Sequence, residues 1–188
     1  MNSSFFSDYF QSINQTTLSI DSKKLIQVAE LVKTVSVKSK KIILIGNGGS
    51  AAIASHVAVD FTKAAQVRAI NFNEADLITC FANDFGYDKW VVEALSAYAD
   101  PGDLAILISS SGKSPNIVNG AVKAKQMGLK VVTLSGFDQG NPLRKLGDIE
   151  LWADSSAYNV VEMTHHIWLL AIVDYAIATN GTASKLNR

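Results

Sequence analysis

This chain has almost no cysteine and no formal net charge. Cys80 is the only cysteine among 188 residues, so no disulfide can form within the chain, as is usual in reducing compartments. Lysine plus arginine and aspartate plus glutamate both number 17, which gives a formal net charge of +0. A balanced charge provides no electrostatic footprint for nucleic acid or for an anionic membrane. We therefore expect a protein that binds neither directly.

Long apolar runs are scarce as well. No run reaches the roughly 18 apolar residues of a membrane span, and residues 1–15 lack the basic start and apolar centre of a signal peptide. A hydrophobic share of 48% with 18% charged residues is typical of globular proteins. The length is enough for one domain with a sizeable core. We expect a single-domain cytoplasmic protein.

The stretch Lys41–Ser50 is the feature around which the rest of the chain is organised. An apolar run of strand length leads into the sequence GNGGS, Gly46–Ser50, and an alanine-rich helical segment follows. Glycine permits positive φ angles, and the free N–H groups that open a helix form an anion site. This pattern predicts a phosphate or another anion at Gly48 to Ser50. Gly46-x-Gly48-x-x-Ala51 also satisfies the loose dinucleotide fingerprint, so this turn alone leaves the ligand open.

A second loop of the same kind follows the apolar strand expected at 104–108. Its sequence is SSSGKS, Ser109–Ser114, and Pro115 stands at a plausible first helical position. Serine hydroxyls beside free helical N–H groups match phosphate oxygens, although serines also commonly fill surface turns and cap helices. Because both loops follow strands of one parallel sheet, they lie at the same edge. Their pairing favours a phosphate site.

Strands and helices alternate along the chain. We expect strands at 42–45, 67–71, 104–108, 130–134 and 149–152, with helices between them and a long apolar helix at 158–178. This order predicts a doubly wound α/β fold with a parallel sheet covered on both faces. A dinucleotide site would need an acidic residue at the end of the second strand. Ile70–Asn73 has none, and Glu74 comes only at the next helix, which counts against dinucleotide binding.

Two N-terminal helices precede this alternation, and a polar tail follows it. An apolar stripe that includes Phe5, Phe6 and Phe10 recurs at helical spacing, and Asp21 is placed as the N-cap of a second helix. We predict N-terminal helices in residues 1–40 that pack on the domain and in an oligomer. The main domain covers 41–180, and 181–188 form a polar tail.

Three motifs together resemble those of the sugar isomerase (SIS) family, in particular its phosphoheptose isomerase subgroup: GNGGS, Asn83–Gly86 (NDFG) and SSSGKS. The resemblance implies a three-layer doubly wound sandwich with a mainly parallel five-stranded sheet, extra N-terminal helices and a homotetramer. It implies an isomerase acting on sedoheptulose 7-phosphate or a related sugar phosphate, in lipopolysaccharide or capsule heptose synthesis. It places the phosphate-binding groups at Asn47, Gly48, Ser50, Ser109, Ser110, Ser111 and Ser114, and site-ordering groups at Asn83 and Asp84.

The catalytic positions of the family match less well. By resemblance, the helix after the glycine loop carries a histidine and, four residues on, a glutamate base, which are here His56 and Asp60. The family's last helix carries a glutamine and, eight residues later, a histidine. Those positions are here Val161 and Leu169, and an expected arginine is Ala64. His56 and Asp60 alone match the zinc positions of some members, and two protein ligands are too few for an ordinary zinc site. We therefore expect no required cofactor, with zinc as an open alternative.

His165 shares a helical face with Val161 and Leu169, because it lies four residues from each. We hypothesise an altered acid/base set, with Asp60 as the base and His56 or His165 as the acid or stabilising group. The alternative for His165 is a satisfied histidine in a packed helix. His166 points about 100° away, towards the face of Glu162.

The altered catalytic positions also leave a second function class open. Some relatives of these isomerases bind the bacterial replication initiator instead of converting a sugar. The alternative is therefore a non-catalytic sugar-phosphate sensor or protein-interaction module with intact phosphate loops.

Overall fold

A five-stranded parallel sheet forms the centre of the computed structural model, which describes residues 4–179. The strand order is β2-β1-β3-β4-β5, so the chain winds outwards in both directions from the middle of the sheet. The central strands β1 and β3 are buried along their whole length, as expected for a sheet covered on both faces. The doubly wound fold is thereby confirmed. The strands are β1 (Ile42–Gly46), β2 (Ala69–Asn71), β3 (Leu104–Ser109), β4 (Lys130–Ser135) and β5 (Ile149–Trp152).

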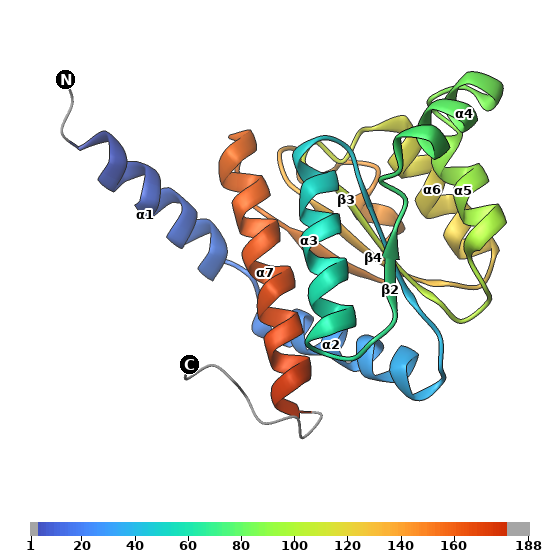
Figure 1. The fold of residues 1–188 in the computed structure, drawn as a ribbon. Coiled ribbons are helices and arrows are strands. Elements are labelled where there is room, and N and C mark those ends of the chain that lie inside the picture. The colour runs from blue at the N-terminus through green and yellow to red at the C-terminus, as the bar shows by residue number, and fades with distance from the viewer. Residues whose placement is uncertain (1–3, 180–188) are drawn as a thin grey trace.

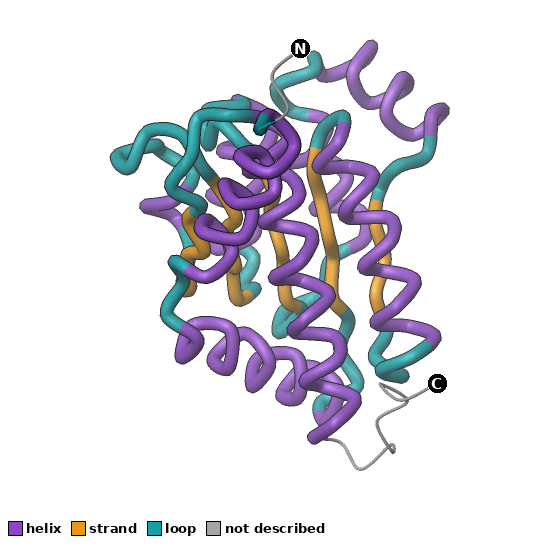
Figure 2. Tube along the Cα trace, turned by 90° about the vertical axis from the view of Figure 1, so that its left-hand side faces the viewer, coloured by secondary structure: helices purple, strands orange, loops and turns teal. Residues whose placement is uncertain are grey.

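Helices cover the two faces of the sheet in two separate layers (Figures 1 and 2). Successive strand residues point to opposite faces, so Ile42 and Leu44 of β1 pack in one core cluster while Ile43 and Ile45 pack in the other. The first cluster joins the sheet to α2 (Ser22–Val37), α3 (Gly49–Lys63) and α7 (Tyr158–Thr179). The second joins it to α4 (Ala75–Phe85), α5 (Trp90–Tyr98) and α6 (Pro115–Gln126), and a short 3-10 helix, Arg144–Leu146, precedes β5.

Helix α1 (Phe5–Leu18) extends away from these layers (Figure 1). Phe5, Phe6 and Phe10 are exposed, and Thr16 is the buried residue among the fully described residues of α1. The indole N–H of Trp168 donates to the carbonyl of Thr17 over 2.9 Å and ties the end of α1 to α7. The predicted apolar stripe of this helix thus lies largely uncovered in the single chain. The polar tail predicted at 181–188 lies outside the described residues.

The N-cap predicted for the second helix is confirmed. The carboxylate of Asp21 accepts a hydrogen bond from the backbone N–H of Lys23 over 2.9 Å, which satisfies one of the free donors at the start of α2. From there α2 buries Val28 and Val32 against the first core cluster.

Helix α7 is the one described helix that is long and apolar enough to cross a membrane by length and composition. Half of its most apolar window is buried within the fold. Its buried residues, Trp168 and Leu169 among them, belong to the core cluster shared with α2, α3 and the sheet. We therefore interpret α7 as a core helix, and its apolar character as the consequence of packing against three neighbours.

Candidate functional site

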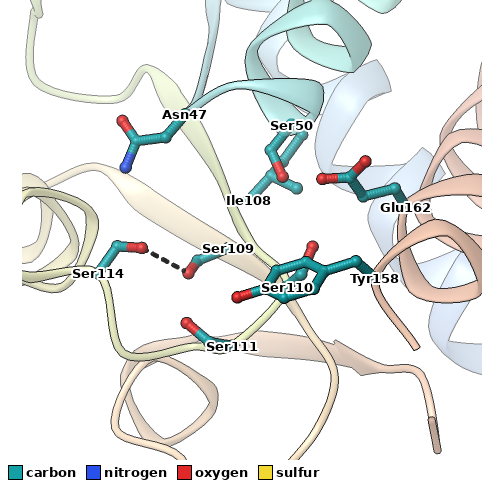
Figure 3. A pocket seen from close by; sticks show the side chains of 9 residues that line it. All are labelled: Asn47, Ser50, Ile108, Ser109, Ser110, Ser111, Ser114, Tyr158 and Glu162. Atoms are coloured by element: carbon teal, nitrogen blue, oxygen red, sulfur yellow. Dashed lines mark hydrogen bonds between the residues drawn. The ribbon is translucent and has the colours of Figure 1, made fainter. Parts of the chain in front are cut away.

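A pocket of about 120 Å³ opens at the carboxyl ends of β1 and β3 (Figure 3). The loops after these two strands meet here because β1 and β3 are parallel neighbours, paired from Ile42–Leu104 to Gly46–Ile108. The pocket thus unites residues from three parts of the sequence, including six of the seven that the sequence predicts for phosphate. Its lining consists of Asn47, Ser50, Ile108, Ser109, Ser110, Ser111, Ser114, Tyr158 and Glu162.

The glycine loop turns sharply between β1 and α3. Gly48 has a φ of +54°, a conformation that residues with side chains rarely adopt. A Cβ on Gly46 would lie 2.6 Å from the backbone of Ser50, so the turn closes too tightly for any side chain there. These constraints start α3 directly behind the pocket and bring Asn47 and Ser50 to its wall. Gly48 contributes its backbone to this turn.

The serine loop keeps its hydroxyl groups directed to the pocket (Figure 3). Ser114 stands at the N-cap of α6 but makes no side-chain capping bond within residues 4–179; its hydroxyl instead lies 3.1 Å from that of Ser109. The buried hydroxyl oxygen of Ser110 has no hydrogen-bond partner among the described residues. The alternative that these serines merely cap the helix is therefore not the arrangement found. They form a cluster of hydroxyl groups beside the start of α6.

Two asparagines lock the two loops together. The amide of Asn47 donates to the side-chain oxygen of Asn116 over 3.0 Å, and the amide of Asn116 donates back over 2.9 Å. Asn116 is buried on α6, and the hydroxyl of Tyr87 also donates to Asn47. Asn116 was missed from the sequence, where it reads as an ordinary helical residue. This reciprocal pair sets the width of the pocket between the loops.

Helix α7 supplies the remaining wall through Tyr158 and Glu162, which the sequence analysis did not assign to the site. They lie four residues apart and so share a helical face. The carboxylate of Glu162 packs on the backbone of Gly49: a Cβ there would lie 2.3 Å from Oε2. The available signal was this i, i+4 pair, which lies only about 60° around the helix from Val161, His165 and Leu169.

His165, hypothesised as an acid or stabilising group, has the arrangement of the alternative, a histidine in a packed helix. Val161, His165 and Leu169 share a face, but all three are buried in the core. Val161 packs at Gly136, and His165 Nε2 donates to the carbonyl of Ser135 over 3.0 Å. Burial lowers the pKa of His165 to about 4, although the bond to Ser135 raises it in part. His165 is a neutral core histidine, because its helical face packs on the sheet rather than on the pocket.

His56 and Asp60 do lie together, with His166 as a third member. His56 Nδ1 is 2.8 Å from His166 Nε2, and His56 Nε2 is 3.4 Å from a carboxylate oxygen of Asp60. The two rings meet edge to face. Burial and then the neighbouring His56 lower the pKa of His166, while Asp60 raises it. This histidine–aspartate cluster joins α3 to α7, and none of its three residues is among the nine that line the pocket.

Asn83 and Asp84 lie in the last turn of α4, where they hydrogen-bond to each other. Both are exposed and stand outside the set that lines the pocket. The contact from this region to the site comes from Tyr87, three residues further on, through its bond to Asn47. The role predicted for Asn83 and Asp84 stays a prediction.

The histidine–aspartate cluster does not form a metal centre as it stands. Within residues 4–179, no group of three or more histidine, cysteine, aspartate or glutamate side chains could hold a metal ion. The two ring nitrogens of His56 face different partners, so the donors of the cluster do not converge on one point. The donor set does not fit zinc.

Comparison with known proteins agrees with this architecture. The family described as "SIS domain" matches residues 6–136. The chain is 31% identical over 166 residues to a probable phosphoheptose isomerase of Thermoplasma volcanium, covering 85% of this chain and 84% of the relative. It is 33% identical over 157 residues to a phosphoheptose isomerase of Fusobacterium nucleatum, covering 81% and 80%.

Solved structures agree in the same way. The phosphoheptose isomerase of Neisseria gonorrhoeae superposes with a TM-score of 0.84 at 27% identity, covering 92% of this chain and 96% of that one. The phosphoheptose isomerase of Francisella tularensis gives 0.85 at 23% identity, covering 95% and 99%, and shows the shared fold.

Proposed function

We propose that this chain, which belongs to the SIS domain family, is a sugar-phosphate isomerase of the phosphoheptose type. Such an enzyme interconverts an aldose and a ketose, here sedoheptulose 7-phosphate and D-glycero-D-manno-heptose 7-phosphate or a related pair. The observation that carries the proposal is the convergence of Asn47, Ser50 and the serine loop on one pocket. This convergence supports a site for one phosphate group and the sugar chain attached to it.

The phosphate would lie at the serine loop. Ser109, Ser111 and Ser114 offer hydroxyl donors beside the start of α6. The positive end of the α6 dipole adds to the attraction for an anion. Asn47, Gly48 and Ser50, which the resemblance also assigns to the site, would contact the ligand from the other loop, with Asn47 held by Asn116.

Isomerisation transfers a proton between adjacent carbons and needs a base together with a donor that polarises the carbonyl. The resemblance assigns these roles to Asp60 and His56, whose side chains lie 3.4 Å apart. His56 matches the family's histidine, and Asp60 keeps a carboxylate in place of the family's glutamate, so acid/base groups remain at both positions. No step of the proposed reaction is assigned to a metal ion.

A cytoplasmic homotetramer acting in heptose synthesis for lipopolysaccharide or capsule remains part of the proposal. The support for self-association is the exposed stripe of α1, in which Phe5, Phe6 and Phe10 are 60%, 68% and 63% exposed. An apolar stripe of this kind is typical of a helix that is covered in an assembly. Sedimentation at several protein concentrations would measure the oligomeric state.

The test is direct conversion. Purified protein is incubated with sedoheptulose 7-phosphate, and heptose 7-phosphate is followed by NMR. Ser114→Ala should weaken the apparent affinity by about 10- to 100-fold, as expected for a hydrogen bond to a charged group. The control Ser96→Ala removes an exposed hydroxyl of α5 and should change nothing. Thermal stabilisation by the sugar phosphate without turnover would indicate the sensor alternative, and absence of both turnover and binding would refute both functions.

A further inference from the structure

The pocket holds one carboxyl group, that of Glu162. Of the nine lining residues, all within the described part of the chain, the other eight carry hydroxyl, amide or apolar side chains. Serine hydroxyls and asparagine amides donate and accept hydrogen bonds, but they are poor proton acceptors. A carboxylate is among the groups that enzymes use as general bases. Glu162 therefore supplies the one carboxylate of the pocket lining.

The position of Glu162 is set by the glycine loop. Its carboxylate lies directly on the backbone of Gly49, the first residue of α3. The partial positive charge at that helix end stabilises a carboxylate. Figure 3 shows the side chain extending from α7 towards Ser50. Gly49 thus has a role beyond the turn: it leaves the space that the carboxylate occupies.

Asp60, the base that the family resemblance suggests, lies elsewhere. It stands ten residues after Ser50 on α3, which is about 15 Å along the axis at 1.5 Å per residue. Its carboxylate is 3.4 Å from His56, whose other ring nitrogen meets His166. The three side chains are engaged with one another, whereas Glu162 faces the pocket itself.

From this arrangement we propose that Glu162 is the general base that moves the proton between the two reacting carbons. The assignment rests on the proposed isomerase function. In the aldose, the carboxylate takes the proton from C2, and the electrons of that C–H bond form the C1–C2 double bond. The carbonyl oxygen at C1 takes up a proton from water, which gives an enediol and leaves hydroxide. Glu162 then returns its proton to C1, where the electrons of the double bond form the new C–H bond, and the hydroxyl at C2 gives its proton to the hydroxide, which yields the ketose and restores the water.

The same arrangement defines the substrate class. The hydroxyl donors of Ser109, Ser111 and Ser114 lie at one wall, and Glu162 projects from the other (Figure 3). Because a phosphate and a carboxylate repel each other, they occupy opposite ends of the site. The ligand that fits is an open-chain sugar whose phosphate is separated from the carbonyl and its neighbouring hydroxyl by several carbons.

The test measures proton transfer separately from binding. Wild-type protein, Glu162→Gln and Asp60→Asn are incubated with sedoheptulose 7-phosphate in D2O, and deuterium entry at C1 is followed by NMR. Glu162→Gln should lower kcat and exchange by about 10²- to 10⁴-fold, while thermal stabilisation by the ligand is kept. The matched control Asp174→Asn removes an exposed carboxylate from the same helix and should leave both unchanged. Should Glu162→Gln not fold, Glu162→Asp, which withdraws the carboxylate by one methylene, should lower kcat with little change in KM.

The outcomes separate this inference from the function on which it rests. Wild-type exchange together with loss in Glu162→Gln but not in Asp60→Asn supports the assignment. Exchange that survives in Glu162→Gln, or is lost only in Asp60→Asn, overturns the role of Glu162 and leaves the isomerase intact. A wild-type protein that neither converts nor exchanges the substrate overturns the isomerase and the role of Glu162 with it.

Discussion

Replacing His165 by leucine tests whether this histidine is a core residue. His165 is fully buried, and its pKa is lowered from 6.5 to about 4 because burial disfavours the charged form. Its Nδ1 has no partner within residues 4–179, and the carbonyl of Ser135 also accepts a bond from Ala153 N–H over 2.8 Å. Leucine therefore removes the titrating group without leaving that carbonyl unsatisfied. The change isolates the effect of the imidazole on stability.

The direction of the pKa shift determines whether the protein gains or loses stability as the pH falls. Below pH 6.5 the unfolded chain binds a proton at this histidine, whereas the folded chain does so only near pH 4. The contribution of neutral His165 to the free energy of unfolding is therefore fully present above pH 6.5 and is lost as the pH falls towards 4. A difference of about 2.5 pKa units corresponds to about 3 kcal/mol in all. Between pH 7 and pH 5, wild-type protein should lose about 2 kcal/mol through His165 alone.

Urea unfolding of wild type and His165→Leu at pH 7, 6 and 5 measures this loss. Buried Trp90 and Trp168 provide the fluorescence signal, and one protein concentration is used throughout because self-association shifts apparent stability. His56 and His166 are present in both proteins, so their contributions cancel in the comparison. The variant should lose about 2 kcal/mol less than wild type over this range. Equal pH dependence would refute the buried neutral state, and a folded variant without turnover would restore His165 to the acid/base set.

Three further predictions concern the site and its support. Gly49→Ala should lower kcat by about 10²-fold, because the new Cβ displaces the carboxylate of Glu162, and should change thermal unfolding little. The control is Gly140→Ala, where a new Cβ meets only Asp138, at 3.5 Å. Asn116→Ala should release Asn47 and weaken sugar-phosphate binding by about tenfold in a titration. Asn119→Ala on the same helix should leave binding unchanged. Equal effects of the two substitutions would contradict the proposal that the Asn47–Asn116 pair holds the two loops together. Asp103→Ala should lower the free energy of unfolding by about 3 kcal/mol, because the nearly buried Asp103 carboxylate pairs with Lys41 at 2.7 Å. A loss below about 1 kcal/mol, the usual value for an exposed pair, would show that Lys41 is satisfied by Asp100 alone.

The layered fold and the two loops of the pocket could be predicted from the sequence alone. Apolar runs such as 42–45 and 104–108 are local signals, and parallel neighbours must end at one edge of the sheet. The proximity of the loops GNGGS and SSSGKS could therefore be predicted without knowing how the helices pack. The need for glycine at Gly46 and Gly48 is also a local property, because the turn leaves no room for a Cβ at Gly46 and requires a positive φ at Gly48.

Which face of α7 lines the pocket depends on tertiary packing and could not be predicted from the sequence. Helical periodicity sorts Val161, His165 and Leu169 from Glu162 and His166, but it does not tell which group meets the sheet and which meets α3. The contacts at Gly136 and Gly49 settle that orientation. The orientation places Glu162 in the pocket lining, which is the basis for proposing it as the base, and places His165 in the core. Such pairings depend on how two distant helices are rotated against each other, which no local pattern of residues encodes.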